Sequence, residues 1–208
     1  MTSAATLVSV TAAWRLGEPA LMCQGAVMVE VLIAEPGDLT STQLEDAEAL
    51  VRAAFGSGFR SHDWAHAVEG VHVFLTEDQA LVAFAAVVPR TLRHDDRVFD
   101  TGYVEAVAVC ADQQGRGLGG AVMAHAETII KSRHRLGALN AVESAAGFYG
   151  HRGWQPWTGH TQASDPTGAL VDTSDDADRI FLLTPPQLTE PLEAHIPLIC
   201  DWRDGDLW

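Results

Sequence analysis

Glu105 is the first residue whose type and setting could do chemistry, because it is the lone charge in an apolar stretch that reads as a strand. A carboxylate facing a dry core would cost several kcal/mol, so we expect it to face a wet cleft or a partner group. Alternation along a strand places Glu105 on the face of Tyr103 and Val107. Val104 and Ala106 would then face the other way. We interpret Glu105 as a general base, acting directly or through a water, with a structural carboxylate capped by N–H groups as the alternative.

Tyr149 offers a second chemical group, a phenol that can donate a proton. It lies on a predicted short helix, 144–150, after a strand expected to run parallel to that of Glu105. From there the phenol could approach the gap between the two strands, or it could simply pack beside Phe148. Moving an acyl group from a thioester to an amine needs a base for the amine and an acid for the departing thiolate. Cys110 could be a nucleophile instead, but no His is patterned as its base, and an inert Cys is more common.

A glycine-rich turn follows the Glu105 strand and opens a helix. After Gly117 the apolar residues recur at helical spacing through Lys131. The first-turn N–H groups of a helix have no intrahelical partner, and the helix dipole adds roughly half a positive charge there. Because glycine has no Cβ, a diphosphate can approach these N–H groups closely. The sequence therefore predicts an anion site at this turn.

The spacing of the glycines distinguishes between anionic ligands. Gly115, Gly117 and Gly120 satisfy G-x-G-x-x-G, but the dinucleotide fingerprint starts directly after the first strand of its unit, which is not the case here. No Lys follows the glycines, so the P-loop pattern is absent. Gln114-x-x-Gly117-x-Gly119 instead resembles the acyl-CoA pyrophosphate loop of the GNAT N-acetyltransferase superfamily. Dinucleotide binding and a purely structural turn remain the alternatives.

The elements that position these groups follow from periodicity and turn signals. Thr40 and Gln43 have capping-box spacing at the start of a helix that Gly56-Ser57-Gly58 ends. A short helix or turn is expected at 61–66 and further helices at 118–131 and 144–150. Strands are expected at 27–33, 71–75, 80–88, from beyond 96 to 109, 136–141 and 180–183. This order predicts an α+β fold with a GNAT-like mixed, mainly antiparallel sheet flanked by helices on both faces. We expect one domain over 26–208 and an N-terminal extension of unknown role over 1–25.

Composition limits the partners of the protein. The chain of 208 residues has a net charge of −15, so nucleic acid and anionic membrane surfaces are poor partners. The same field would attract a polycationic small molecule, although acidity can also serve solubility alone. From Ser164 onward there are ten acidic residues and two basic ones. No apolar run approaches the ~18 residues of a membrane span, and no signal peptide is recognised.

Cysteine and histidine usage argues against disulfides and metal. Cys23, Cys110 and Cys200 are scattered without a C-x-x-C pair, which suits reduced thiols in a cytoplasm. His62 and His66 have the spacing of two metal ligands on a helix, but no third ligand lies near in sequence. We therefore interpret them as an exposed pair and expect no metal.

Longer motifs carry a closer resemblance. Four segments are similar to the mycobacterial aminoglycoside 2′-N-acetyltransferases, and the likeness extends over 29–208: Gly102-Tyr103-Val104-Glu105-x-Val-Ala-Val, Leu136-Gly137-Ala138-Leu139, Tyr149-x-x-Arg152-Gly153-Trp154-x-x-Trp157 and Cys200-Asp201-Trp202-Arg203-x-Gly205-Asp206-x-Trp208. The Trp-rich ending is more specific than the glycine loop. The resemblance implies acetyl-CoA as cosubstrate and a cytoplasmic homodimer. It also implies acetylation of the 2′ amine of gentamicin- or tobramycin-type drugs, and hence resistance to them.

The resemblance also assigns roles by position. Glu105 would be the base and Tyr149 the acid, and the backbones of Val107 and Val109 would pair with the pantetheine arm. The pyrophosphate would be held by Gln114, Gly115, Arg116, Gly117, Leu118, Gly119 and Gly120. The drug would be met by Asp63, Glu105, Ala106, Asn140, Asp175, Asp206 and the carboxylate of Trp208. Several carboxylates are also what a ligand with several ammonium groups requires.

Two departures from the family pattern affect the drug contacts. Gly58 stands at a position where a family carboxylate is expected, so one contact would be missing. Asp176 or Asp178 could serve in place of Asp175, because the alignment of that loop is ambiguous. Two other functions stay open: acetylation of a polyamine, peptide or cell-envelope amine, and a non-catalytic acyl-CoA-binding module.

Overall fold

The computed structural model describes residues 6–9, 28–174, 179–186, 188 and 191–208. Within them the strands form one mixed sheet whose main path is β1-β2-β3-β4-β5-β6-β10-β7. Neighbours on this path are antiparallel except β5 and β6, which are parallel. The strands are β1 (Thr6–Ser9), β2 (Val29–Ala34), β3 (Val71–Glu77), β4 (Ala80–His94), β5 (Arg97–Val109), β6 (Leu136–Asn140), β7 (Gln155–Pro156) and β10 (Ile180–Leu183).

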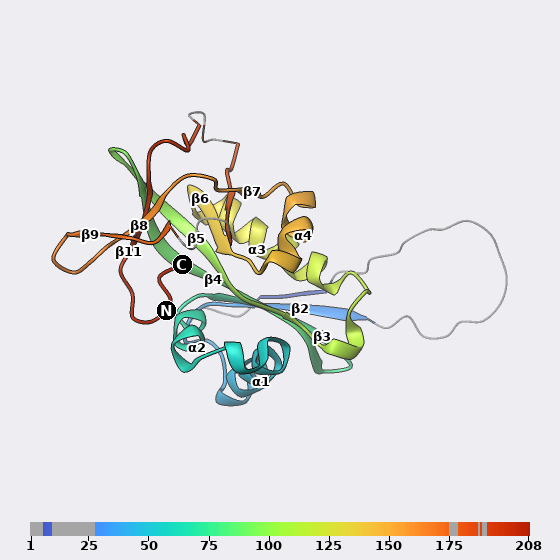
Figure 1. Cartoon of the computed structure of the whole chain (residues 1–208). Helices are drawn as coiled ribbons and strands as arrows, with labels where there is room; N and C mark the ends of the chain where they lie inside the picture. The colour runs from blue at the N-terminus through green and yellow to red at the C-terminus, as the bar shows by residue number, and fades with distance from the viewer. Residues whose placement is uncertain (1–5, 10–27, 175–178, 187, 189–190) are drawn as a thin grey trace, which may run out of the picture.

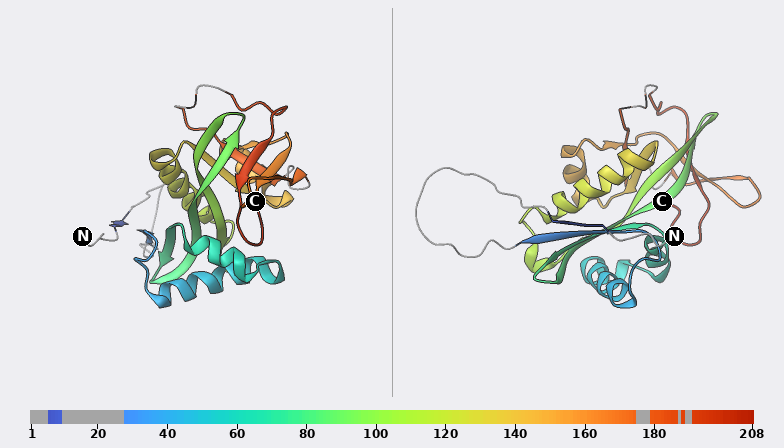
Figure 2. Two further views of the ribbon diagram at one scale, coloured as in Figure 1. Left: turned by 90° about the vertical axis from the view of Figure 1, so that its left-hand side faces the viewer. Right: turned by 180° about the vertical axis from the view of Figure 1, so that it is seen from behind.

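Helices cover both faces of this sheet, as Figures 1 and 2 show. One face carries α1 (Ser41–Phe55) and α2 (Ser61–Val68), and the other carries α3 (Leu118–Arg133) and α4 (Ala146–His151). Short 3-10 turns connect them at η1 (Gly56–Gly58), η2 (Ala111–Gln113) and η3 (Glu143–Ala145). The predicted fold class, a mainly antiparallel mixed sheet flanked by helices on both faces, is confirmed.

The start of α1 follows the predicted capping box. The Gln43 backbone N–H donates to Thr40 Oγ1 at 3.2 Å, and the Thr40 N–H donates to Gln43 Oε1 at 2.9 Å. These bonds satisfy backbone donors that a helix terminus otherwise leaves free. The apolar side of the helix then packs on the sheet through Ala47, Leu50 and Val51.

Strand β4 is longer than the 80–88 that its apolar run predicts. Beyond Pro89 its residues alternate, so that Arg90, Leu92 and His94 are buried while their neighbours are exposed. Because this half of the strand contains polar residues, its hydrophobicity pattern does not identify it as a strand. It is a strand because it pairs with β5 on one edge and with β11 (Leu198–Asp201) on the other.

The terminal part of the chain, expected to be rich in loops, adds three short strands beside β4. β11 pairs antiparallel with β4 and parallel with β8 (Thr161–Ser164), and β8 pairs with β9 (Leu170–Asp172). Each has only three or four residues, too few to show a period. They build a second apolar core whose members include Leu92, Phe99, Tyr103, Trp157, Leu198 and Trp208.

Glycines let α3 lie close to the parallel pair of strands. Gly102 of β5 and Gly137 of β6 are directly opposite each other. A Cβ on Gly102 would lie 2.9 Å from a side-chain atom of Ile130, and one on Gly137 would lie 3.1 Å from the same side chain. This close approach fixes the C-terminal part of α3, at Ile130, against the two strands.

Residues 6–9 of the predicted extension form β1, which pairs antiparallel with residues 30–33 of β2. The described part of the extension is therefore an edge strand of the same sheet. The domain boundary at residue 26 lies outside the described residues and stays a prediction.

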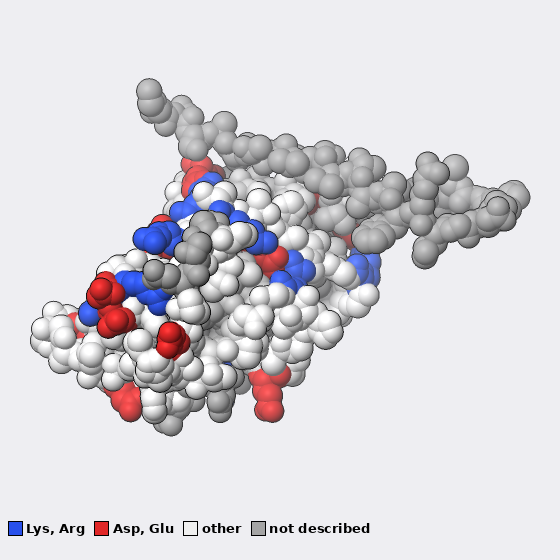
Figure 3. All heavy atoms as spheres, turned by 90° about the horizontal axis from the view of Figure 1, so that it is seen from above, with Lys and Arg blue, Asp and Glu red and all other residues white. Residues whose placement is uncertain are grey.

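The net charge is unevenly distributed over the surface. On the face in Figure 3, seen from above in Figure 1, Lys and Arg side chains gather in the central part. The overall charge of −15 therefore does not describe this face. In the part of the chain that the structure describes, no helix is long and apolar enough to cross a membrane.

Candidate active site

Strands β5 and β6 separate after a short parallel contact. Residues Thr101–Tyr103 pair with Leu136–Ala138, after which β6 ends at Asn140 while β5 continues to Val109. The separation leaves the β6-facing edge of β5 free to pair with something else. An extended chain could add to this edge as a strand does, through main-chain hydrogen bonds.

A β-bulge lies in β5 at the same place. The register between β4 and β5 shifts between Phe84 and Ala86, and Ala106 has a φ of +55°. A non-glycine residue in this left-handed region costs about 1–2 kcal/mol. Bulges are over-represented next to active sites, where they redirect side chains.

The bulge overturns part of the predicted alternation. Glu105 lies opposite Ala86, and Ala106 packs in the same cluster as Ala86, on the face of α1 and α2. Val107 packs with Val104 on the opposite face. Glu105 therefore shares its face with Ala106 and not with Val107, because the extra residue reverses the alternation from that point on.

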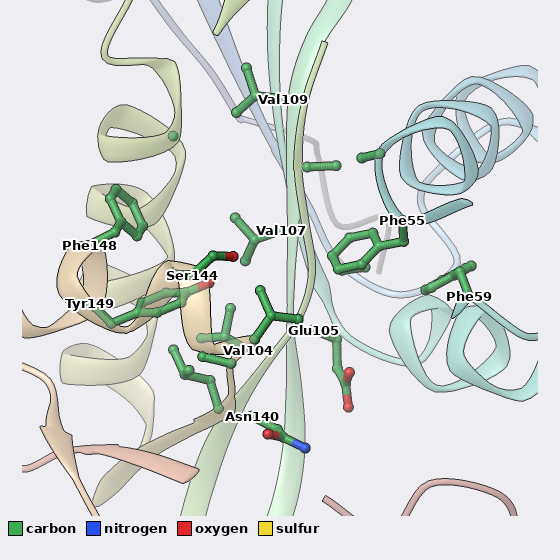
Figure 4. A pocket seen from close by; sticks show the side chains of 18 of the residues that line it. Phe55, Phe59, Val104, Glu105, Val107, Val109, Asn140, Ser144, Phe148 and Tyr149 are labelled. Carbon is green, nitrogen blue, oxygen red and sulfur yellow. The ribbon is translucent and has the colours of Figure 1, made fainter. Parts of the chain in front are cut away.

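The separated strands, the glycine turn, α4 and the chain terminus enclose one cavity of about 820 Å³, seen in Figure 4. Nearly all of the predicted site residues that the structure describes line it: Asp63, Glu105, Ala106, Val107, Val109, Gln114, Gly115, Gly117, Leu118, Gly119, Gly120, Asn140, Tyr149, Asp206 and Trp208. Gly58 lines it as well. The predicted contact at Asp175, with Asp176 and Asp178 as alternatives, lies outside the described residues.

The glycine turn has the geometry of an anion site. Gly117 precedes the first residue of α3 with a φ of +82°, which side chains rarely adopt, and no side chain caps the helix. The backbone N–H groups of the first turn, at Leu118, Gly119 and Gly120, therefore have no intrahelical partner. These donors at the positive end of a 16-residue helix fit a diphosphate.

Arg116 is the predicted loop residue that does not line the cavity. Its guanidinium donates two hydrogen bonds to the Glu77 carboxylate, each of 2.8 Å, and contacts Gln113. The side chain thus ties the turn to the end of β3. A role for Arg116 in cofactor binding stays a prediction, and its guanidinium is engaged elsewhere.

Glu105 is paired with a residue that the sequence did not single out. Arg203 Nη1 lies 2.5 Å from Glu105 Oε1, and the two side chains are 12% and 16% exposed. Burial raises the pKa of Glu105, and the Arg203 and Arg90 guanidiniums oppose that rise. Arg203 belongs to the Trp-rich ending, and that motif was the only feature of the sequence that pointed to this residue.

Tyr149 lies on α4 and reaches the cavity from a different wall (Figure 4). It is 8% exposed, with ring centroids 6.2 Å from Trp154 and 6.0 Å from Phe181. Burial raises the pKa of Tyr149 to about 12, against an opposing effect of Arg152. The phenol is protonated at neutral pH, as an ordinary tyrosine is, and the raised pKa makes it a weaker acid than an ordinary tyrosine.

A buried polar cluster fixes α4 against α3. Arg152 donates to both oxygens of Glu127, at 2.7 and 2.9 Å, and Trp154 Nε1 donates to the same carboxylate at 3.0 Å. Glu127 is 7% exposed and Trp154 is fully buried. Because Arg152 and Trp154 directly follow α4, this cluster sets the place of the Tyr149 phenol.

Four of the predicted acceptor contacts that line the cavity are Asp63, Asn140, Asp206 and Trp208. Asp63, on α2, accepts a hydrogen bond from the Arg60 N–H at 2.7 Å. Trp208 is 2% exposed and donates through Nε1 to Thr173 at 2.8 Å. Asn140 Oδ1 is buried and has no hydrogen-bond partner among the described residues, so it is available to a ligand.

The acidic terminal segment does not all face the cavity. Asp165 and Asp172 accept hydrogen bonds from their own loops, and Asp201 pairs with Arg90 at 2.8 Å. Of the described acids in this segment, Asp206 lines the cavity. The number of acidic residues in this segment could not show which of them line the cavity.

The other candidates from the sequence, His62, His66 and Cys110, make structural contacts. His62 and His66 are half-buried and not exposed as predicted, because the segment at Gly205 packs on the His62 ring. Within the described ranges no group of three or more His, Cys, Asp or Glu could hold a metal. Cys110 donates through Sγ to the Leu81 carbonyl, and burial raises the pKa of its thiol.

Sequence reasoning missed three aromatic residues of the cavity. Phe55 and Phe59, at the end of α1 and after η1, face β5 from one side, and Phe148 of α4 faces it from the other (Figure 4). Phe55 and Phe148 are 43% and 38% exposed. Exposed aromatic side chains at the mouth of a cavity can contact a bound ligand, but their spacing in sequence gives no such signal.

Solved acetyltransferases share this fold. The GNAT family N-acetyltransferase YhbS from Escherichia coli, in complex with CoA, matches 88% of this chain and 94% of its own with a TM-score of 0.63 and 10% identity. The ribosomal-protein-S18-alanine N-acetyltransferase from Escherichia coli matches 78% of this chain and 99% of its own with a TM-score of 0.53 and 20% identity. At these identities the likeness concerns the fold alone.

Sequence comparison gives the family. The acetyltransferase (GNAT) domain model matches residues 35–157, so the fold and the site define a GNAT acetyltransferase. The aminoglycoside 2′-N-acetyltransferase of Mycolicibacterium fortuitum is 38% identical over 185 residues, which are 89% of this chain and 95% of the relative. Within the GNAT superfamily, the chain belongs to the family of that enzyme.

Proposed function

We propose that this protein transfers the acetyl group of acetyl-CoA directly to the 2′ amine of an aminoglycoside. The observation that carries the proposal is that Glu105 and Tyr149 line one cavity where β5 and β6 separate. A base and an acid on different walls suit an amine and a thioester held side by side, with no covalent enzyme intermediate. The 38% identical relative, named for this activity, supports the choice of acceptor.

The cofactor half of the site would be formed by backbone groups. When bound, acetyl-CoA supplies the acetyl group as a thioester. The free edge of β5 at Val107 and Val109 suits the pantetheine arm, which carries amide groups that can pair as a strand does. The N–H groups at the start of α3 suit the diphosphate, and the Gly117 conformation leaves room for it.

The chemical half would rely on proton transfers by two side chains. Glu105 takes a proton from the ammonium form of the acceptor, directly or through a water, which frees the nitrogen lone pair to attack the thioester carbonyl. Tyr149, whose pKa of about 12 keeps it protonated at neutral pH, gives its proton to the departing sulfur, and the phenolate then recovers a proton from the acylated nitrogen. Donation from a phenol avoids release of a free thiolate into the cavity.

The acceptor would bind between α2 and the chain terminus. Asp63 and Asp206 offer carboxylates to ammonium groups, and Asn140 offers an unpaired amide oxygen. Charge-assisted hydrogen bonds of this kind are about twice as strong as neutral ones. The protein's net charge of −15 would also draw a polycation toward the site.

One assay tests the acceptor. CoA thiol release is followed with two aminoglycosides that differ only in carrying an amine or a hydroxyl at the 2′ position. We expect turnover with the amine alone. Equal turnover of both would contradict the 2′ assignment. Turnover of neither, with acetyl-CoA still bound, would favour another amine as acceptor or a non-catalytic acyl-CoA-binding module.

In the cell, this activity would confer aminoglycoside resistance in the cytoplasm, where acetyl-CoA is available. Expression in a susceptible host should then raise the inhibitory concentration of the 2′-amino drug and not of its 2′-hydroxyl partner. By analogy with the family we also expect a homodimer, which sedimentation at micromolar concentration would test.

A further inference from the structure

The ion pair between Arg203 and Glu105 lies inside the cavity and joins groups 98 residues apart in sequence. Arg203 Nη1 donates to Glu105 Oε1 at 2.5 Å, which leaves Oε2 to receive a proton. Both side chains are largely buried, at 12% and 16% exposure. Arg203 thus contacts the very carboxylate that is proposed to act as the base.

Arg203 is held in place by its surroundings. Its Nε donates to the Asp206 carbonyl at 2.5 Å, and its guanidinium lies 5.4 Å from the ring centroid of Tyr103. A second guanidinium, that of Arg90, lies 5.2 Å from the same ring. Arg90 also bonds the Asp201 carboxylate and carbonyl and the Leu207 carbonyl, at 2.7–2.8 Å. The segment after β11 therefore presents Arg203 in a fixed geometry.

The charged and titratable groups around Glu105 come from four elements. Arg203 belongs to the terminal segment, Arg90 to β4, Asp63 to α2 and Tyr103 to β5. Burial and the Asp63 carboxylate favour the protonated form of Glu105, whereas the two arginines favour the ionised form. Arg203 is the one in hydrogen-bond contact, so its effect is the larger of the two.

We propose that Arg203 is a positioning residue that keeps Glu105 ionised and aims its free oxygen, Oε2, at the acceptor amine. Its effect reaches the reaction through Glu105. Without this partner, burial would raise the pKa of the Glu105 carboxyl further and favour its protonated form, which cannot accept another proton. The inference rests on the proposed function, in which Glu105 is the base.

The pH dependence of kcat/KM tests this role. On the acidic side of this pH profile, here called the acid limb, kcat/KM falls as the base of the free enzyme becomes protonated. In Arg203→Gln the limb should move to higher pH by roughly 1–3 units, the usual effect of a contacting arginine on a carboxyl group. Arg203→Lys keeps a cation near Glu105 and should restore most of the shift. The matched control, Arg133→Gln, removes an exposed ion pair with Glu35 and should leave the limb where it is.

Further variants separate the outcomes. If Arg203→Gln does not fold, Arg203→Ala with millimolar guanidinium added should recover the parent limb. An unmoved limb in the Gln variant, or turnover above the parent at neutral pH, would overturn the inference. Glu105→Gln distinguishes the two proposals: full turnover in that variant would overturn the proposed base and the inference with it. A loss of turnover there, combined with an unmoved limb in Arg203→Gln, would overturn the inference alone.

Discussion

Replacing Gly205 by alanine should dislodge the segment that carries Arg203 and Asp206. Gly205 has a φ of +86°, and a Cβ built on it would lie 2.4 Å from Cδ2 of the His62 ring. No real Cβ approaches an aromatic carbon so closely, so either the segment or α2 must move. Gly168 offers a matched control, since it also has a φ of +86° but nothing within 4 Å of its Cβ position.

The magnitude follows from comparing these two glycines. Alanine in the left-handed conformation costs about 1–2 kcal/mol at either position. At Gly205 the overpacking against His62 adds roughly 1–3 kcal/mol. We therefore expect the free energy of unfolding of Gly205→Ala to lie below that of Gly168→Ala by about 1–3 kcal/mol. The kcat/KM for the acceptor should fall as well, by up to tenfold for each ~1.4 kcal/mol lost from docking of the segment.

Denaturant unfolding, acceptor kinetics and acetyl-CoA affinity measure the three consequences. Acetyl-CoA affinity should stay the same, because Gly205 is not among the residues that line the cavity, whereas the glycine turn and β5 are. Adding His62→Ala to Gly205→Ala should recover part of the loss by making room for the Cβ. Equal behaviour of Gly205→Ala and Gly168→Ala in all three measurements would refute the reasoning, since it would mean that the segment does not pack on α2.

Three further changes probe the site and its support. Tyr149→Phe should lower kcat by roughly 10²–10⁴-fold and leave acetyl-CoA affinity nearly unchanged, and an unaltered kcat would exclude the phenol as the acid. In the parent enzyme, because burial raises the pKa of Tyr149 to about 12, its ionisation should cause no loss of kcat up to about pH 10. Asp206→Asn should raise the KM of the acceptor and leave acetyl-CoA affinity unchanged. An unchanged acceptor KM with weaker acetyl-CoA binding would contradict the placement of this carboxylate in the acceptor site. Glu127→Gln should lower the free energy of unfolding by about 2–4 kcal/mol, reduced from a fully buried pair because the Arg152 side chain is 20% exposed. Loss of less than about 0.5 kcal/mol in chemical denaturation would show that the cluster does not hold α4.

Much of the fold is encoded locally and could be predicted. The Thr40 capping box, the strand of Glu105 and the glycine turn with its helix each occupy a few neighbouring residues. Periodicity and turn chemistry therefore identify them without knowledge of the rest of the chain.

Other features depend on contacts that no local pattern contains. The bulge at Ala106 is the backbone conformation of one residue, and hydrophobic alternation assumes that no such residue is present. Strand β11 is defined by its partners β4 and β8, which lie far away in sequence. The pairing of Arg203 with Glu105 likewise arises only once the sheet is assembled.

The terminal segment has a consequence for how this enzyme could change. The matched acetyltransferase domain ends at residue 157, while Arg203, Asp206 and Trp208 lie beyond it and reach back into the cavity. Under the proposed function, the residues for the acyl donor lie inside that domain, whereas those for the acceptor amine come from both parts: Asp63 and Asn140 before residue 157, and Asp206 and Trp208 after it. Substitutions after residue 157 would then change one part of the acceptor site and leave the donor site unaltered.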